Sequence, residues 1–213
     1  MDRDLQIDTL CSYYLVSRET ITSLKNYEKI LIRANNSLNL IGKSTIQQIW
    51  NRHILDSFQV IDFIDKNDKT LIDVGSGAGL PGIILGIAAK NKKIPLKIHL
   101  IDKSKKKTNF LKETVKKLNL NINVICKNIF ENENEREIVS DVFIARAFKP
   151  LPTILKLIHN KGIKYKKFFV FLGKTGKKEL LLVSKIWDIQ YKQHMSVTNS
   201  DSLIIEINNL KKK

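Results

Sequence analysis

At residues 70–82 the chain reads Thr70-Leu-Ile-Asp73-Val-Gly75-Ser-Gly77-Ala-Gly79-Leu80-Pro-Gly82. The apolar start of this stretch is typical of a buried strand, and residues 83–89, which follow it, are typical of a buried helix. The glycines between them let the backbone turn tightly and approach a ligand closely. Strand, glycine turn and helix together form the first half of a nucleotide-binding βαβ unit.

Two classes of ligand compete for this turn. Residues 77–82 fit the dinucleotide pattern G-x-G-x-x-G, whereas the longer string from Asp73 to Gly79 fits the first motif of S-adenosylmethionine (SAM) methyltransferases. The carboxylate of Asp73 favours SAM, because it can meet the cationic amino-acid end of that molecule, directly or through water. The same charge would sit poorly beside a pyrophosphate. A glycine turn that binds no ligand is the remaining alternative.

Composition restricts the class of protein. The chain has 213 residues, 43% of them hydrophobic, and a formal net charge of +16. That charge indicates a polyanionic partner, either nucleic acid or an acidic membrane surface, although a lysine-rich coding bias would also raise it. Cys11 and Cys126 lie far apart without metal-ligand spacing, so we expect no metal site and a reducing compartment. Without an apolar signal segment or a membrane-length apolar run, we expect a soluble cytoplasmic protein.

The pattern of apolar residues changes near residue 66. Residues 1–66 show helical spacing and contain one glycine and no proline, which predicts an N-terminal helical cap. Within it, Ser44-Thr-Ile-Gln47 is a capping box that predicts one helix running to about Phe63. Residues 67–213 are predicted to form a separate SAM-binding domain.

From Thr70 onward, strand patterns alternate with helix patterns, which predicts an α/β fold with a mostly parallel, Rossmann-like sheet. The last two strands are close enough in sequence to pair as an antiparallel hairpin, and an acidic loop is expected at residues 131–137. The seven predicted strands cover residues 70–74, 96–102, 121–126, 141–145, 167–172, 187–197 and 203–207.

Several residues follow the predicted strands at the edge where such sheets bind ligands. Asp102 ends the second strand, where an acid commonly binds ribose hydroxyls, or it caps the next helix. Ile129 and Phe130 follow the third strand and are placed to sandwich an adenine ring, or simply to pack in the core. Arg146 follows the fourth strand in apolar surroundings and therefore needs an anionic partner, which could be a SAM carboxylate, a phosphate or a nearby acid.

Basic residues indicate contacts with a nucleic acid. Lys105 and Lys106 crowd a predicted helix start, where cations oppose the helix dipole, although a solvated lysine-rich face is the alternative. Lys174 lies in a flexible turn after the fifth strand. His53 is expected to be structural from its surroundings alone, with Arg52 beside it.

The absence of certain motifs narrows the methyl acceptor. The chain has no Asp/Asn-Pro-Pro-aromatic string for exocyclic amines and no Pro-Cys for covalent attack on pyrimidines. A ring nitrogen such as guanine N7 carries no proton and needs no general base. No general base is evident in the sequence, so we assign no catalytic residue.

Four blocks carry a family resemblance. Asp73-Val-Gly-Ser-Gly-Ala-Gly-Leu-Pro-Gly-Ile83 closely resembles the glycine loop of the bacterial small-subunit rRNA methyltransferase G family, RsmG, also called GidB. Arg52-His53-Ile-Leu-Asp-Ser57 is similar to its second hallmark. Asp102-Lys-Ser-Lys-Lys-Lys and Ala145-Arg146-Ala-Phe148 resemble further blocks in the same order, so the resemblance covers nearly the whole chain.

The resemblance implies a class I methyltransferase fold and SAM-dependent methylation of guanine 527 at N7 in 16S rRNA or a small-subunit precursor. It also implies SAM contacts at Gly75, Leu80, Ile129, Phe130 and Arg146. We add Asp73, Gly77 and Asp102 as cofactor-binding residues. The predicted RNA-binding residues are Arg52, His53, Lys105, Lys106 and Lys174.

Two other classes of function stay open at this point. One is an NAD-dependent oxidoreductase on a dinucleotide-binding fold, and the other is a non-catalytic RNA-binding protein that shares the fold. A monomer is expected in each case.

Overall fold

The computed structural model describes residues 2–131, 138–199 and 202–213 of the chain. A seven-stranded sheet forms its centre, with the strand order β3-β2-β1-β4-β5-β7-β6. The predicted α/β architecture is therefore confirmed. The strands are β1 (Thr70–Val74), β2 (Lys97–Asp102), β3 (Ile122–Cys126), β4 (Val142–Ala145), β5 (Lys167–Leu172), β6 (Trp187–Met195) and β7 (Leu203–Lys212).

The strand directions fix where a ligand can bind. Strands β1 to β5 run parallel, whereas β7 pairs antiparallel with both β5 and β6, as expected for the C-terminal hairpin. The chain moves from β1 to β2 and β3 in one direction, and then returns to β4 on the other side of β1. Such a reversal opens a crevice at the carboxyl ends of the strands, which is where open α/β sheets bind their ligands.

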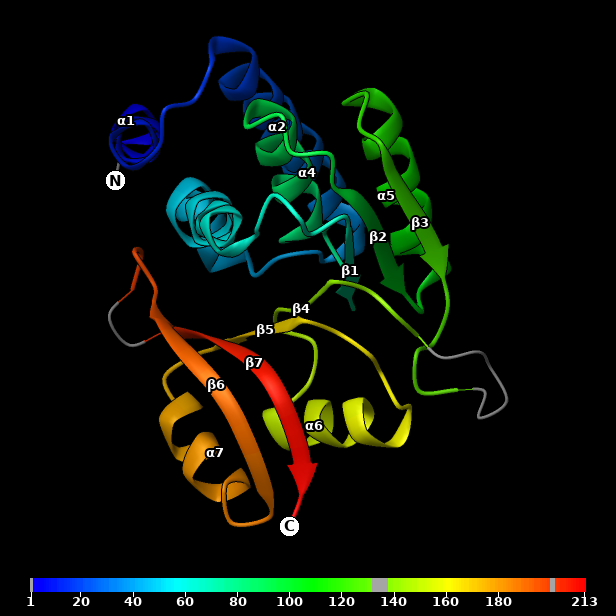
Figure 1. The fold of residues 1–213 in the computed structure, drawn as a ribbon. Helices are drawn as coiled ribbons and strands as arrows, with labels where there is room; N and C mark the ends of the chain where they lie inside the picture. Colours follow the sequence, from blue (N-terminus) through cyan, green and yellow to red (C-terminus); the bar gives the residue numbers. More distant parts are fainter. Residues whose placement is uncertain (1, 132–137, 200–201) are drawn as a thin grey trace.

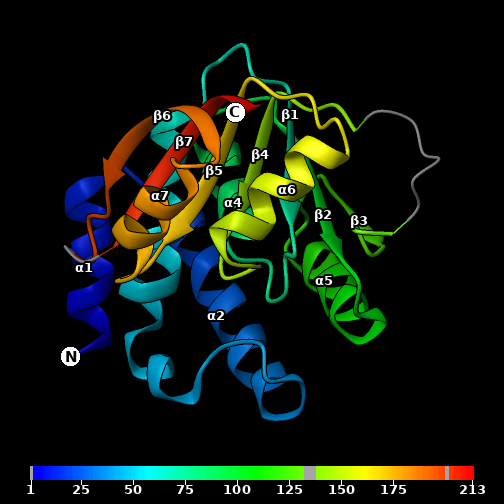
Figure 2. The ribbon, with the colours of Figure 1, turned by 90° about the horizontal axis from the view of Figure 1, so that it is seen from below.

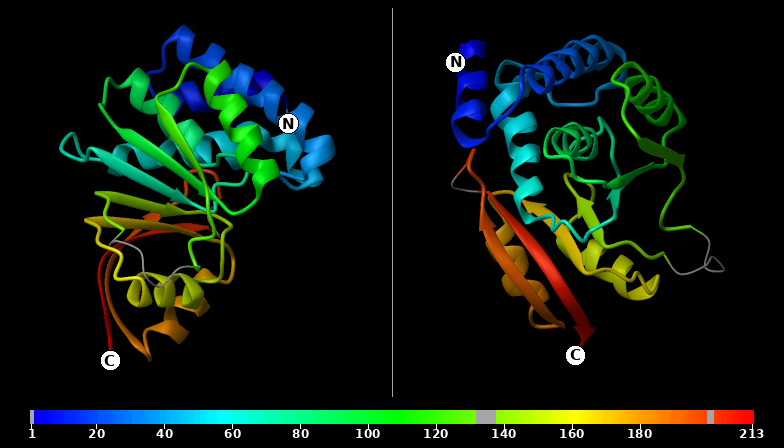
Figure 3. Two further views of the ribbon diagram at one scale, coloured as in Figure 1. Left: turned by 90° about the vertical axis from the view of Figure 1, so that its right-hand side faces the viewer. Right: turned by 45° about the horizontal axis from the view of Figure 1, so that its top comes forward.

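Helices cover both faces of the sheet (Figures 1 and 3). On one face lie α1 (Arg3–Tyr13), α2 (Arg18–Leu38), α4 (Gly82–Asn91) and α5 (Lys105–Lys117), and on the other α6 (Leu151–Asn160) and α7 (Gly176–Val183). The side chains of Ser17 and Ser104 accept hydrogen bonds from the first turns of α2 and α5, so both helix starts are capped. Figure 2, which views the molecule from below, shows α2 lying beside α4.

The segment at residues 43–63 differs from the prediction of one capped helix. It forms a 3₁₀ turn (Lys43–Gln48), a π-helical turn (Trp50–Leu55), a short α turn, α3 (Asp56–Phe58), and a second 3₁₀ turn (Gln59–Phe63). The capping box is not used, because Gly42 occupies the cap position with no side-chain hydrogen bond. Trp50 and Phe58 are fully buried, and packing these large side chains overrides the local preference for a regular helix.

The N-terminal cap and the sheet share one hydrophobic core. Leu10, Leu24 and Leu31 from the cap belong to the same buried cluster as Leu71 and Leu100 from the sheet. A division into separate domains at residues 66 and 67 stays a prediction. The expected acidic loop lies outside the described residues, apart from Glu131.

Within the described parts of the chain, none of the helices combines the length and the apolar character that a bilayer crossing requires. In those same parts, no three His, Cys, Asp or Glu side chains converge as ligands for a metal ion.

Candidate active site

The glycine turn is held against the neighbouring strand by backbone hydrogen bonds. The N–H groups of Gly75 and Ser76 both donate to the carbonyl of Ile101, at 2.8 and 3.1 Å. Gly75, Gly77 and Gly79 have φ values of 72°, 54° and 86°, in the left-handed region that favours glycine. The hydroxyl of Tyr27 in α2 donates to the carbonyl of Ala78 at 3.0 Å, so the N-terminal cap also supports the turn.

Asp73 lies behind the glycine turn and is only 1% exposed. Its Oδ2 accepts a hydrogen bond from the N–H of Gly82 at 3.0 Å, at the start of α4. Its Oδ1 is buried and has no hydrogen-bond partner among the described residues. Burial raises the pKa of this carboxyl to about 7, despite the hydrogen bond from Gly82 and the charge of Arg146. A contact between Asp73 and a cofactor stays a prediction.

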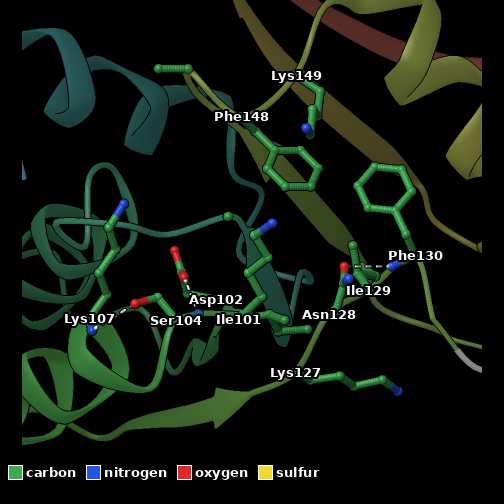
Figure 4. Close-up of a pocket in the computed structure, with 13 residues that line it drawn as sticks. Ile101, Asp102, Ser104, Lys107, Lys127, Asn128, Ile129, Phe130, Phe148 and Lys149 are labelled. Atoms are coloured by element: carbon green, nitrogen blue, oxygen red, sulfur yellow. Dashed lines mark hydrogen bonds between the residues drawn. The ribbon is translucent and has the colours of Figure 1, made fainter.

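The first of two neighbouring cavities lies at the carboxyl ends of β1, β2 and β3 and has a volume of about 430 Å³. We call it the aromatic cavity, because the rings of Phe130 and Phe148 face each other there, with centroids 5.7 Å apart (Figure 4). Basic side chains stand around the opening. Its wall includes Gly75, Ile101, Asp102, Ile129, Phe130 and Phe148, with Lys103, Lys107, Lys127 and Lys149.

Phe148 is placed by an unusual backbone conformation. Ala147 has a φ of 49°, which directs the next residue back over the glycine turn. A Cβ atom added to Gly75 would stand 2.1 Å from Cδ2 of Phe148, so only glycine allows this contact. The aromatic cavity therefore depends on the pairing of Gly75 and Phe148.

Asp102 presents a fixed carboxylate to the aromatic cavity. Its Oδ2 accepts from the N–H of Gly77 at 2.9 Å, and its Oδ1 accepts from the N–H of Ser104 at 2.8 Å. Each oxygen keeps a further lone pair, as a carboxylate has about four acceptor sites. The residue thus holds Ser104, the N-cap of α5, and remains able to accept hydrogen bonds from a ligand.

The second cavity, which we call the polar cavity, lies at the end of β4 and has a volume of about 450 Å³. Three distant parts of the chain line it: residues 45–56, Arg146 and the turn between β6 and β7. Arg146 forms an ion pair with Asp56 at 3.1 Å, with side chains 15% and 12% exposed. The predicted anionic partner of Arg146 is thus Asp56 in this structure.

Asp56 is held by several donors at once. Its Oδ1 accepts hydrogen bonds from Gln59 Nε2 at 2.9 Å, Ser196 Oγ at 2.9 Å and Thr198 Oγ1 at 3.2 Å. Because Ser196 and Thr198 belong to the C-terminal hairpin, these bonds join the hairpin to the N-terminal cap. A buried ion pair is favourable only when such additional hydrogen bonds satisfy it.

His53 is neutral in the polar cavity. Burial, with the charges of Arg146 and Arg52, lowers its pKa to about 3. The guanidinium of Arg146 approaches its Nδ1 at 3.4 Å and can only donate, so Nδ1 accepts. Nε2 therefore carries the proton and donates to Thr45 Oγ1 at 2.8 Å, and this hydroxyl donates to the carbonyl of Gly42 at 2.7 Å.

The structure places most of the predicted site residues in the two cavities or at the glycine turn. Gly75, Asp102, Ile129 and Phe130 line the aromatic cavity, and Arg52, His53 and Arg146 line the polar cavity. Leu80 is buried in the core beside the turn, and Gly77 binds Asp102. Lys105, Lys106 and Lys174 line neither cavity.

Sequence reasoning missed part of both cavities. Phe148 stood within a block that resembles the family, which was a usable signal. Thr45 lay inside the predicted capping box, where no role was given to its side chain. Ser196 and Thr198 offered no signal, because their role depends on contacts with residues about 140 positions away.

Comparison with known proteins identifies the family. A family model described as rRNA small subunit methyltransferase G matches residues 20–205. The chain belongs to this family. Among its relatives, ribosomal RNA small subunit methyltransferase G of Pelagibacter ubique is 41% identical, over 93% of this chain and 92% of the relative. The protein of the same name from Rickettsia felis is 36% identical, over 92% and 97%.

Solved structures agree on the fold. M. capricolum TrmK in complex with S-adenosyl-homocysteine superposes with a TM-score of 0.53 at 23% identity, covering 71% of this chain and 66% of that one. Magnesium protoporphyrin IX methyltransferase from Synechocystis, solved with bound SAM, gives 0.55 at 12%, covering 86% and 97%. This member of the methyltransferase G family thus has the class I methyltransferase fold and is a SAM-dependent rRNA methyltransferase.

The aromatic cavity fits the cofactor of this family. Its volume is within the usual range for small-molecule sites, which are mostly apolar with a few placed polar groups. The binding of ribose hydroxyls by Asp102 and of an adenine ring by Ile129 and Phe130 stays a prediction, as does a SAM contact at Gly75.

Proposed function

We propose that this methyltransferase transfers the methyl group to N7 of guanine 527 in 16S rRNA. The observation that carries the proposal is a pair of cavities that both take residues from the short segment after β4. The segment after β4 contributes Arg146 to the polar cavity and Phe148 to the aromatic cavity. Cofactor and acceptor base would then lie on the two sides of one short segment. The family resemblance supplies the identity of the nucleotide.

The polar cavity supports an acceptor that has no proton to lose. Guanine N7 is such an acceptor, because its lone pair is free at neutral pH. His53 is neutral but both its ring nitrogens are engaged, and Asp56 is held by Arg146 and three further donors. These groups are suited to position a base rather than to remove a proton from it.

SAM supplies an electrophilic methyl group on a positively charged sulfur. The chain's own contribution is to hold and orient the two reactants. Asp102 and the aromatic pair Phe130 and Phe148 would hold the nucleoside end of the cofactor, while the Arg146–Asp56 pair fixes the walls around the acceptor.

The test is to map methylation in RNA from cells with and without the gene, by mass spectrometry of 16S rRNA fragments. We expect 7-methylguanine at position 527 only where the gene is present, and purified protein with SAM should restore it. Methylation at another position, or at another atom of guanine 527, would refute the proposal.

The proposal extends to the working state of the protein. We take it to act as a cytoplasmic monomer without a metal ion, on 16S rRNA or a small-subunit precursor. Light scattering on the purified protein tests the monomer, and activity after EDTA treatment tests the metal. Methylation of naked rRNA, compared with precursor particles, identifies the substrate form.

A further inference from the structure

Some lysines of this protein have an acidic partner and others have none. Three lysines of the β5–β7 side of the sheet and its loops are paired: Lys166 with Asp141 at 2.8 Å, Lys167 with Asp68 at 3.0 Å and Lys192 with Glu206 at 3.8 Å. On α2 and α5 the cations have no acidic partner among residues 2–131, 138–199 and 202–213. They include Lys29, Arg33, Lys105, Lys106, Lys107, Lys112, Lys116 and Lys117.

A groove runs between α2 and α5, which are in contact with each other. Its volume is about 500 Å³, and Lys29 and Arg33 face Lys117 across it. Asn26 and Ser37 add polar groups, and Glu113 is the acid in its wall. Positive charges on both sides of a groove create a potential that attracts a polyanion.

Helix α5 connects this groove with the aromatic cavity. Lys107, in its first turn, lines the cavity, and Lys117, in its last turn, lines the groove. Ten residues separate them, so the distance along the helix is about 15 Å. An RNA strand that passes the opening of the aromatic cavity can therefore follow α5 and reach the groove.

We infer that the α2–α5 groove binds the phosphate backbone of the rRNA next to the methylated nucleotide. The inference rests on the proposed function, because it takes rRNA as the ligand. An anionic membrane surface fits less well, because a membrane-binding helix exposes an apolar face. The apolar residues of α5, such as Phe110, Leu111 and Val115, are buried against the protein.

The test removes three charges from the groove and three from elsewhere. The groove variant is Lys29→Gln, Arg33→Gln and Lys117→Gln. The matched control is Lys156→Gln, Lys185→Gln and Lys212→Gln, three exposed lysines on the side of α6, α7 and β7. Binding to 16S rRNA is measured by filter retention over a series of salt concentrations, and SAM binding by calorimetry.

Affinity for RNA falls as the salt concentration rises, and each phosphate contact contributes roughly 0.7–0.9 to the steepness of log affinity against log salt. In the groove variant this steepness should therefore decrease by about 2. The control variant should keep the wild-type slope, and both variants should keep wild-type SAM affinity. Glu113→Gln should tighten RNA binding, because it removes a like charge from the path of the phosphates. A destabilised protein could not produce that gain.

Equal slopes for the groove and control variants would overturn the inference. So would a groove variant that loses binding to phosphatidylglycerol vesicles but not to RNA. If wild-type protein bound rRNA but methylated a different nucleotide, the proposed function would fail while the salt slopes still decided the role of the groove.

Discussion

The two cavities at the carboxyl edge of the sheet are similar in volume but different in construction. The aromatic cavity is lined by Gly75, Lys107 and residues 101–104, 127–130 and 147–149, and the ring of Phe148 packs against Gly75. The polar cavity joins residues 45–56, Arg146 and the C-terminal hairpin through a network of charge-assisted hydrogen bonds. Under the proposed function, the first cavity would hold a cofactor that is exchanged at every turnover, and the second would hold a base in one orientation.

The largest effect should come from the ion pair of the polar cavity. Arg146→Ala leaves Asp56 buried without its cationic partner, so we expect the free energy of unfolding to fall by about 3 kcal/mol. Methyl transfer should also be lost. Urea unfolding measures the first effect, and methylation of 16S rRNA measures the second.

Arg52→Ala is the matched control, because Arg52 lines the same cavity with an exposed side chain. Its backbone carbonyl, which accepts a hydrogen bond from Arg146, is retained in the variant. We expect a stability change within about 0.5 kcal/mol. Equal losses of stability in Arg146→Ala and Arg52→Ala would mean that the polar cavity does not depend on a buried ion pair.

The next effect concerns the carboxyl behind the glycine turn. The pKa of Asp73 is about 7 in the folded chain and about 3.9 when unfolded, so the folded state binds more protons between these values. The protonated carboxyl therefore makes its full contribution to stability below pH 4. As the pH rises to 7 this contribution is lost, and the free energy of unfolding falls by up to about 1.4 kcal/mol per pH unit. Asp73→Asn removes the titrating group. In ligand-free protein, the free energy of unfolding measured with urea should therefore lose this dependence on pH. Parallel profiles for variant and wild type would show that this carboxyl does not titrate there.

Gly75→Ala should damage the aromatic cavity specifically. Forcing alanine to a φ of 72° costs about 1–2 kcal/mol, and its Cβ would displace Phe148. We expect lower thermal stability and weaker SAM binding by calorimetry. Gly173→Ala, where nothing lies within 4 Å of an added Cβ, should change neither. If Gly75→Ala binds SAM as wild type does, the pairing of Gly75 with Phe148 is not part of the cofactor site.

The smallest effect should come from Phe130, whose side chain is 38% exposed. Phe130→Ala removes a stacked aromatic pair that contributes about 0.5–1 kcal/mol, so SAM affinity should fall by roughly two- to fivefold. Leu15→Ala, at a position that is 99% exposed, provides the comparison and should leave SAM affinity unchanged. An unchanged affinity in both variants would place the adenine ring elsewhere.

The regular part of the fold could be predicted because its signals are local. The strand pattern and glycines of residues 70–82 and the alternation after them identify the parallel sheet, and short spacing identifies the C-terminal hairpin. The segment at residues 43–63 was predicted wrongly, because Trp50 and Phe58 are placed by tertiary packing rather than by helix propensity.

The same distinction applies to the candidate site. Gly75, Asp102, Ile129 and Phe130 were expected at one edge of the sheet, and they line one cavity there. That Arg146 pairs with Asp56 could not be read from spacing, because 90 residues separate them and the pair depends on how the cap folds over β4.

The hydrogen bond from Ser196 to Asp56 spans 140 positions of the chain. On a translating ribosome, a nascent chain that ends before Ser196 already contains every residue of the aromatic cavity, but it cannot complete the polar one. Such a fragment would contain the residues proposed to hold the cofactor before it contained those that complete the polar cavity. Its activity toward RNA would begin only when synthesis of the protein is nearly finished.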